Sequence, residues 1–248
     1  MENALLVGLS RQIALARELD VIANNVANSG TNGFKARSSR FEEFTIPTAK
    51  AETFKSRDRN LSFVIDAGTP MDISPGDIET TGNPLDAAIK GDSFFVVQTP
   101  RGERFTRTGS FTLDNQGQLV TSDGYPVLTE DGPLTVPQQE TGLAIGADGT
   151  MSTSQGKKGK LRLVRFDDTR TLTNEGANLF SSRAQPQPAG TAGRLEVGAV
   201  EKSNVRPVVE MTRLIEVNRA YTNVAGLIGK MDDMKRTALS RLADASTS

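Results

Sequence analysis

Apolar residues recur at helical spacing at both ends of the chain. From Leu214, alternating steps of three and four residues meet apolar side chains at eight of nine positions, the last being Leu242. From Leu5 to Val26, the same steps meet a polar side chain only at Gln12. An average repeat of 3.5 over three to four heptads is typical of a coiled-coil seam. The pattern therefore predicts one helix at each end, each with an apolar stripe, and we expect the two helices to pair.

The middle of the chain has a different pattern, with short apolar runs between turn residues. All 11 prolines lie between Pro47 and Pro207, and residues 1–29 and 208–248 contain no glycine except Gly8, Gly226 and Gly229. Proline breaks helix interiors and glycine weakens them, so helices are expected only at the ends. Pro-Arg-Gly, Asp-Asn-Gln-Gly and Asp-Gly between the runs predict tight hairpins. The expected strands are residues 94–98, 104–107, 111–113, 119–121, 126–129 and 161–166.

These two patterns predict the α+β class. Strands about ten residues apart, with no helical pattern between them, favour a mainly antiparallel central domain, arranged as a meander or an open barrel. We expect four segments: an N-terminal helical segment (1–33), an extended linker (34–70), the central β domain (71–206) and a C-terminal helical segment (207–248).

Composition excludes several classes of chemistry. The 248 residues contain no His and no Cys, which removes Ser-His-Asp and Cys-His catalysis, His-based or thiolate metal sites, and disulfides. Carboxylates near turns are weak evidence for a glycosidase pair. The formal net charge of −1 does not indicate a nucleic-acid binder. We therefore expect no enzyme, no metal and no cofactor.

The N-terminal residues carry no ordinary targeting signal. The longest apolar run there, residues 4–9, is shorter than a secretory signal or a membrane span requires. Taken alone, this indicates a cytoplasmic protein without a membrane span.

Asparagines are concentrated where the first predicted helix should end. Asn24, Asn25 and Asn28 precede Ser29-Gly30, and Asn and Gly both accept the backbone conformation that closes a helix. One Asn would be enough for that purpose. We therefore expect the others to make contacts with neighbouring chains, because an Asn side chain both donates and accepts hydrogen bonds.

Five stretches, in order, resemble the bacterial flagellar rod and hook proteins. Residues 19–35 are similar to the N-terminal signature of that family, and residues 81–95 to the start of its central β domain. Residues 104–111 and 117–128 continue the likeness, and residues 203–215 are similar to the C-terminal signature. The resemblance covers almost the whole chain. Length and residues 162–168 favour a proximal-rod member, with a distal-rod or hook-type member as the alternative.

The resemblance implies a structural subunit of the basal-body rod, the tube that crosses the periplasm and passes motor torque to the hook. It implies export through the flagellar type III apparatus without a cleaved signal, which replaces the cytoplasmic interpretation. The implied partners are copies of the same chain and other rod subunits.

Assembly is expected to depend on the terminal stripes. A ligand-binding β module and an enzyme based on a carboxylate pair remain as alternatives, which a ligand-sized pocket or a facing carboxylate pair would favour. The expected assembly-interface residues are Leu5, Leu9, Ala16, Leu19, Ala23, Asn24, Asn25, Val26, Asn28, Leu214, Val217, Tyr221, Val224, Ile228 and Met231.

Overall fold

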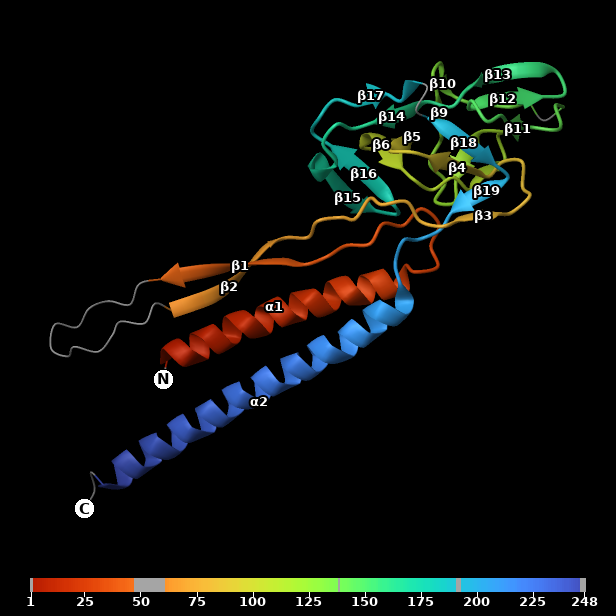
Figure 1. The fold of residues 1–248 in the computed structure, drawn as a ribbon. Helices are drawn as coiled ribbons and strands as arrows, with labels where there is room; N and C mark the ends of the chain where they lie inside the picture. Colours follow the sequence, from red (N-terminus) through yellow and green to blue (C-terminus); the bar gives the residue numbers. More distant parts are fainter. Residues whose placement is uncertain (1, 47–60, 138, 191–192, 246–248) are drawn as a thin grey trace. The chain divides into compact units, whose positions relative to one another are not determined.

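Two terminal helices and many short antiparallel strands form the described part of the chain (Figure 1). The structure is a computed structural model that describes residues 2–46, 61–137, 139–190 and 193–245. The expected α+β class and the antiparallel central region are confirmed. The chain divides into a helical unit (Met1–Ala27, Arg37–Pro70 and Arg206–Ser248) and a β unit (Asn28–Ala36 and Met71–Val205).

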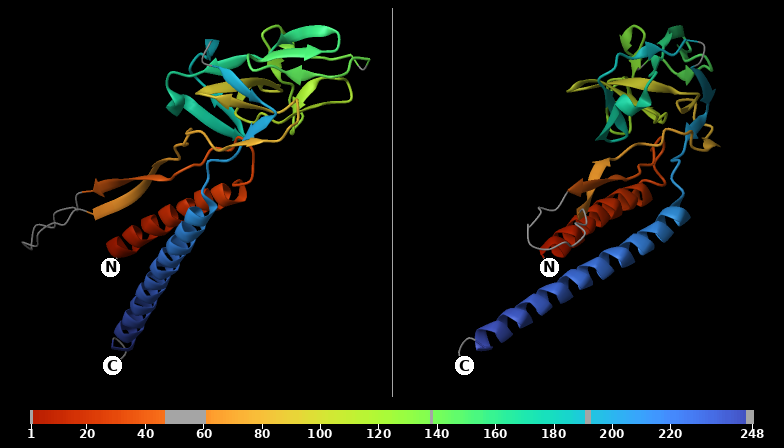
Figure 2. Two further views of the ribbon diagram at one scale, coloured as in Figure 1. Left: turned by 45° about the vertical axis from the view of Figure 1, so that its right-hand side comes forward. Right: turned by 60° about the vertical axis from the view of Figure 1, so that its left-hand side comes forward.

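The helical unit contains α1 (Glu2–Ala27) and α2 (Pro207–Ala245), which run in opposite directions (Figures 1 and 2). Pro207 is the first residue of α2, where its fixed φ suits a helix and its missing N–H costs nothing. Glu210 in the first turn faces the positive end of the helix dipole. With 26 and 39 residues, α1 and α2 are about 39 Å and about 58 Å long.

A two-stranded ribbon completes the helical unit. Strands β1 (Arg40–Ile46) and β2 (Leu61–Gly68) pair antiparallel, with Phe44 opposite Phe63 and a register irregularity next to Arg40. Strand β2 lies against α1. A two-stranded ribbon is marginally stable alone, so this packing supports it. The sequence predicts extended chain here but carries no signal that the two strands pair.

The β unit is built from short strands, and every pairing between its described strands is antiparallel. A six-stranded sheet has the order β15-β16-β6-β5-β14-β17, and a three-stranded sheet has the order β11-β12-β13. Four further pairs are β7-β8, β9-β10, β4-β18 and β3-β19. The bounds are β3 Ile78–Thr80, β4 Ala87–Lys90, β5 Ser93–Thr99, β6 Gly102–Thr106, β7 Phe111–Leu113, β8 Leu119–Thr121, β9 Leu128–Thr129, β10 Gly132–Pro133, β11 Ala144–Ile145, β12 Thr150–Thr153, β13 Gly156–Lys160, β14 Leu163–Arg165, β15 Leu172–Gly176, β16 Leu179–Ser182, β17 Gln187–Pro188, β18 Arg194–Val197 and β19 Ala199–Glu201, with a 3-10 turn at Thr169–Thr171.

Strand β5 is buried on both faces and organises the core of the β unit. Phe95 and Val97 belong to one cluster of buried apolar residues, and Phe94 and Val96 to a second. Successive side chains of a strand point to opposite faces, so one strand serves both clusters. Phe95 packs edge-on against Phe111, with ring centroids 5.0 Å apart. Close packing of this kind makes the β unit a stiff body.

The connections in the main sheet are partly local and partly long-range. Strands β5 and β6 form a hairpin, as the Pro-Arg-Gly turn predicts, and so do β15 and β16. Strand β16 also pairs with β6, and β14 with β5, although each pair is far apart in sequence. Neither described helix has an apolar stretch long enough to cross a bilayer.

Candidate assembly interface and chain junction

The inner faces of α1 and α2 bring together six of the residues that the sequence analysis selected. Leu15, Ile22 and Val217 are buried at the centre of one cluster. The selected residues that join Val217 in it are Leu19, Val26, Leu214, Tyr221 and Val224. Ile22 is 2 % exposed and Leu15 is 6 % exposed, although neither lies on the selected stripe. The contacts between the two helices are therefore shifted slightly around α1 from that stripe.

The other selected residues have mixed surroundings. Leu5, Ala16, Asn28, Ile228 and Met231 are half-buried, whereas Leu9, Ala23 and Asn24 are exposed. Gly8 lies at a close approach of the helices, since a Cβ added there would be 3.2 Å from Cγ1 of Ile228. Their role in assembly stays a prediction.

Asn25 is the most deeply buried of the three selected asparagines, at 1 % exposure. Its Oδ1 accepts a hydrogen bond of 3.0 Å from the Arg37 backbone N–H, and its Nδ2 donates to the Arg37 carbonyl at 2.7 Å. The same Nδ2 donates to Oε2 of Glu210 at 3.2 Å. One side chain thus joins the end of α1, the chain that leads to β1, and the first turn of α2. Asn25 has a structural role inside its own chain.

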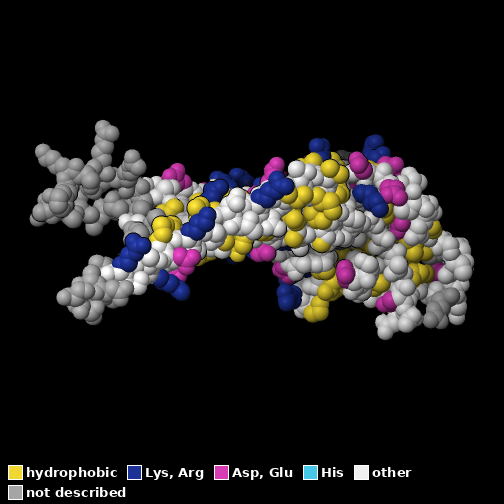
Figure 3. All heavy atoms as spheres, turned by 90° about the horizontal axis from the view of Figure 1, so that it is seen from below, with side chains coloured by type: hydrophobic (Ala, Val, Ile, Leu, Met, Phe, Trp, Pro, Cys, Tyr) yellow, Lys and Arg dark blue, Asp and Glu magenta, His cyan; other side chains and the backbone are white. Residues whose placement is uncertain are grey.

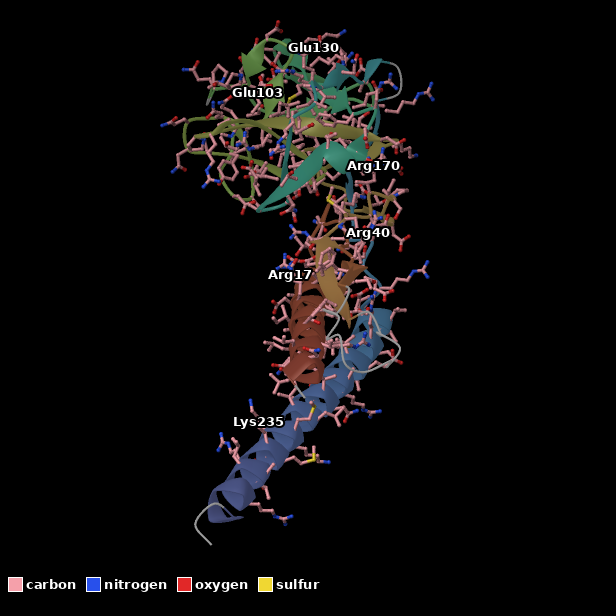
Figure 4. The ribbon with its side chains drawn as sticks, turned by 90° about the vertical axis from the view of Figure 1, so that its left-hand side faces the viewer. Arg17, Arg40, Glu103, Glu130, Arg170 and Lys235 are labelled. Carbon is pink, nitrogen blue, oxygen red and sulfur yellow. The ribbon has the colours of Figure 1, made fainter. Side chains whose placement is uncertain are left out.

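Two ion pairs at the surface also join α1 to α2 and to the ribbon. Arg213 on α2 donates to Oε1 of Glu18 on α1 from Nη2 at 2.7 Å. Arg17, labelled on α1 in Figure 4, lies 3.5 Å from the Asp66 carboxylate on β2. Both pairs are partly exposed, so each contributes at most about 1 kcal/mol.

A second set of apolar side chains on both helices remains exposed. On α1 these are Leu6, Leu9 and Ile13. Hydrophobic side chains are visible along α2 in the space-filling view (Figure 3). Exposed contiguous apolar surface on a soluble protein commonly marks an interaction site. The exposed members on α2 are Val208, Val209, Met211, Ile215, Leu227, Met234 and Leu239.

A groove of about 400 Å³ lies within the helical unit, between α1 and the ribbon. Leu15 of α1, Phe41 of β1 and Val64 of β2 line it, together with charged residues such as Arg11 and Glu18. No residue of the β unit contributes to this groove, so it does not support a ligand-binding β module. Within the described residues, no group of three or more acidic side chains could hold a metal ion.

The β unit contains a buried ion cluster that the sequence analysis did not select. Nζ of Lys35 lies 2.5 Å from Oε1 of Glu201, and Nη1 of Arg107 lies 3.6 Å from Oε2 of Glu201. All three side chains are at most 1 % exposed. The Arg107 guanidinium also lies over the Phe94 ring, 4.8 Å from its centroid. Two cations and one anion are thus held out of water at one place.

Burial dominates the electrostatics of this cluster. It lowers the pKa of the Lys35 ammonium below its usual range, and the attraction of the Glu201 carboxylate opposes that shift. Burial likewise lowers the pKa of Arg107, against the attraction of Glu201 and Asp92. Because removing charges from water is costly, a buried ion cluster is weak evidence for stability but can fix one specific arrangement.

The sequence holds only a faint signal for this cluster. Lys35 and Arg107 each follow a buried Phe-containing stretch, and Glu201 follows Val200 in a strand. Surface charges are usually solvated, so nothing in the pattern marks these three as buried. The stretches that resemble the flagellar family nevertheless contain Lys35 and Arg107.

Gly33 allows the chain next to this cluster to pack closely. Its φ is +70°, and a Cβ added there would lie 2.5 Å from the backbone N of Thr108. We expect Gly33→Ala to lower the free energy of unfolding of the β unit by about 3 kcal/mol, from strain and a backbone clash. Urea unfolding measures the loss.

Gly124→Ala is the matched control, since Gly124 has a φ of +82° and open space around it. It should cost about 1 kcal/mol, the conformational strain alone. Equal losses in the two variants would show that the close approach to Thr108 is unimportant.

Comparison with known proteins identifies the family. The model "Flagella basal body rod protein" matches residues 5–35, "Flagellar hook protein FlgE/F/G D1 domain" matches residues 88–153, and "Flagellar basal body rod FlgEFG protein C-terminal" matches residues 196–241. The "Flagellar basal-body rod protein FlgF" of Caulobacter vibrioides is 41% identical over 247 residues, which cover 98% of each chain. The chain belongs to the flagellar basal-body rod protein family.

Other relatives of this rod protein agree. FlgF of Mesorhizobium japonicum is 35% identical over 249 residues, covering 99% of this chain and 100% of the relative. The "Flagellar basal-body rod protein FlgG" of Buchnera aphidicola (subsp. Schizaphis graminum) is 37% identical over 238 residues, covering 87% of this chain and 90% of the relative. The family consists of structural rod proteins rather than enzymes, so the rod protein is a structural subunit of the flagellar basal body.

Proposed function

We propose that the chain is a proximal-rod subunit of the FlgF type that assembles through its terminal helices into a helical drive shaft. The observation that carries this proposal is the pair of apolar faces on α1 and α2. One face is used within the chain, around Ile22 and Val217, and the other is exposed. Near full-length similarity to FlgF proteins supports the proximal position.

In this proposal the two helices form a coiled coil, and neighbouring subunits cover the exposed faces. Contacts of this kind repeat head to tail without closing, and such contacts produce a filament. The proposed assembly interface combines the fifteen selected residues from Leu5 to Met231, several of which pack between the two helices, with the exposed apolar residues of α1 and α2 given above. Segments 1–33 and 207–248 supply these contacts, and 34–70 is the extended linker between the first of them and the β domain. Residues 71–206 form that β domain, with its sheets curved into an open barrel.

The proposed location is the rod where it crosses the periplasm, and the proposed route is the flagellar type III export apparatus. The partners are copies of the same chain and other proximal and distal rod subunits. Torque passes along the rod because each subunit is held by many closely packed contacts.

Leu227→Asp tests the exposed face without disturbing the fold. Leu227 is 60 % exposed on α2, so the charge should change the stability of the free protein by less than about 0.5 kcal/mol. In the rod, the carboxylate would enter an apolar contact between subunits, which is costly. We expect the variant to be absent from purified basal bodies and the cells to lose swimming, as measured by immunoblot and soft-agar spreading.

Asn218→Asp supplies the matched control. It adds the same charge nine residues earlier, half a turn around α2 from the side that Leu227 shares with Val209 and Met234. It should be incorporated and support swimming. Normal incorporation of Leu227→Asp would contradict assembly through this face.

A further inference from the structure

The chain passes between its two units four times, after residues 27, 36, 70 and 205. On the β-unit side, the segments next to three of these passages are bonded to one another. They are residues 33–36, 71–77 and 201–205, which we name the entry, return and exit segments. Backbone bonds link them directly: Gly33 N–H donates to the Glu201 carbonyl at 2.7 Å, and Asp72 N–H donates to the Ala36 carbonyl at 2.8 Å.

One buried ion pair contacts all three segments. Lys35, from the entry segment, donates from Nζ to the Ser74 carbonyl of the return segment at 2.7 Å and to Oε1 of Glu201 in the exit segment at 2.5 Å. The same Oε1 accepts the Gly76 N–H of the return segment at 3.0 Å. These bonds are charge-assisted, and their donors and acceptors are held in fixed directions.

Asn204 repeats this pattern without a charge. Its Oδ1 accepts the Ala36 N–H of the entry segment at 2.7 Å. Its Nδ2 donates to the carbonyls of Asp72 and Ser74 in the return segment at 2.9 Å and 3.1 Å. Glu201 and Asn204 of the exit segment are therefore each hydrogen-bonded to both the entry segment and the return segment.

This arrangement is costly for a role in stability alone. An apolar core could replace a buried ion pair at little or no cost in stability. Directional bonds at one place instead fix how three chain segments lie with respect to one another. A load carried by three bonded segments is shared among them, whereas separate segments would each yield by rotation about their own single bonds.

We propose that Lys35, Glu201 and Asn204 form a mechanical clasp that makes the connecting segments bear load together. A twisting force that reaches the β unit through the chain is then passed on by three segments at once. The inference rests on the proposed rod function, and it adds the place within the subunit where torque enters the β unit.

Lys35→Met in the full-length protein tests the clasp. It removes the bonds that the Lys35 ammonium makes to the return and exit segments, and it leaves Glu201 balanced by Arg107. We expect hydrogen exchange at Gly33, Ala36 and Gly76 to become at least about tenfold faster, while exchange in β5 stays unchanged. The matched control is Lys90→Met, which breaks the exposed Lys90–Glu196 pair of the same unit and should change none of these rates.

A second variant keeps the result decisive if Lys35→Met unfolds the β unit, which faster exchange in β5 would reveal. Asn204→Ala leaves the ion cluster intact and should release the entry and return segments in the same way. Unchanged exchange at Gly33, Ala36 and Gly76 in Asn204→Ala would overturn the clasp.

Motor measurements connect the clasp to load. The variant to use is the one in which hydrogen exchange shows that the three segments are released while β5 stays protected. Cells that carry it should assemble basal bodies containing the subunit. Their motors should rotate a small bead normally but fail to rotate a large bead. Normal rotation of the large bead would overturn the clasp and leave the rod function standing. Absence of the wild-type subunit from purified basal bodies would instead contradict the rod function, while the exchange rates would still decide whether the segments are clasped.

Discussion

Replacing Glu201 with Gln should lower the free energy of unfolding of the β unit by about 3–5 kcal/mol, because two buried cations then lack their common anion. Glutamine has nearly the same shape, so the loss reports the charge rather than a cavity. The two tyrosines allow the β unit to be followed separately: in a Tyr221→Phe background, Tyr125, which packs against the β core, is the remaining one. Urea unfolding monitored by its fluorescence measures the effect.

Glu196→Gln is the control for this experiment. It removes the carboxylate of an exposed pair with Lys90 in the same unit and should cost less than about 1 kcal/mol. If the two variants lose similar stability, the buried cluster is not electrostatically important.

The pH dependence of Glu201→Gln follows from the lowered pKa of Lys35. The Glu201 carboxylate is the main group that opposes the effect of burial on the Lys35 pKa. Without it, the pKa of Lys35 in the folded protein falls further, and the ammonium releases its proton more readily. The unfolded chain, with an ordinary lysine pKa of 10.5, holds that proton to higher pH. The unfolded state then binds more protons than the folded state, so raising the pH stabilises the fold of Glu201→Gln. The difference in free energy of unfolding between the wild type and Glu201→Gln should therefore be smaller at about pH 9.5 than at pH 7.

Val224→Asp should abolish swimming and leave the β unit folded. Val224 packs against the cluster centred on Leu15, Ile22 and Val217, and a carboxylate there would be forced into the contact between the helices. The helical unit would lose this packing, and the subunit would be absent from purified basal bodies. Ile228→Asp, close to Gly8, should act in the same way.

Asn223→Asp is the control for folding of the helical unit, because Asn223 is exposed and directly precedes Val224, so its charge stays outside the contact between the helices. Soft-agar spreading and immunoblots of basal bodies measure the outcome, and Tyr125 fluorescence reports whether the β unit is intact. Normal swimming by both Val224→Asp and Ile228→Asp would contradict assembly through the terminal helices.

The helices could be predicted because their signal is long and uninterrupted. The stripe from Leu214 continues over many turns without proline, so periodicity alone defines α2. The stripe from Leu5 selected the correct helix but not its most buried apolar residues, Leu15 and Ile22. Periodicity gives a face of about a third of the helix, and the partner decides which part of that face is covered.

The ribbon and several strands could not be predicted for identifiable reasons. In β1, Phe41 and Phe44 are three residues apart, which is not the alternation of a half-buried strand. Its partner β2 begins at Leu61, beyond residues 47–60, so no tight-turn signal connects the two. Strands such as β10 and β17 contain two residues each, too few to show any period.

The buried cluster could not be predicted because its members are remote from one another in sequence. Lys35 and Glu201 are separated by 166 positions, and each is charged. Only the folded chain shows that Gly33, with its close approach to Thr108, places Lys35 beneath the surface.

That separation has a consequence for the order of events when the chain is made or delivered from its N-terminus. The entry segment emerges early, but its bonding partners Glu201 and Asn204 come close to the end. Contacts this remote in sequence are slow to form and cannot form at all until the late residues are available. On the proposed export route, the β unit would therefore stay unfinished inside a narrow conduit, and it would close only when almost the entire polypeptide has emerged.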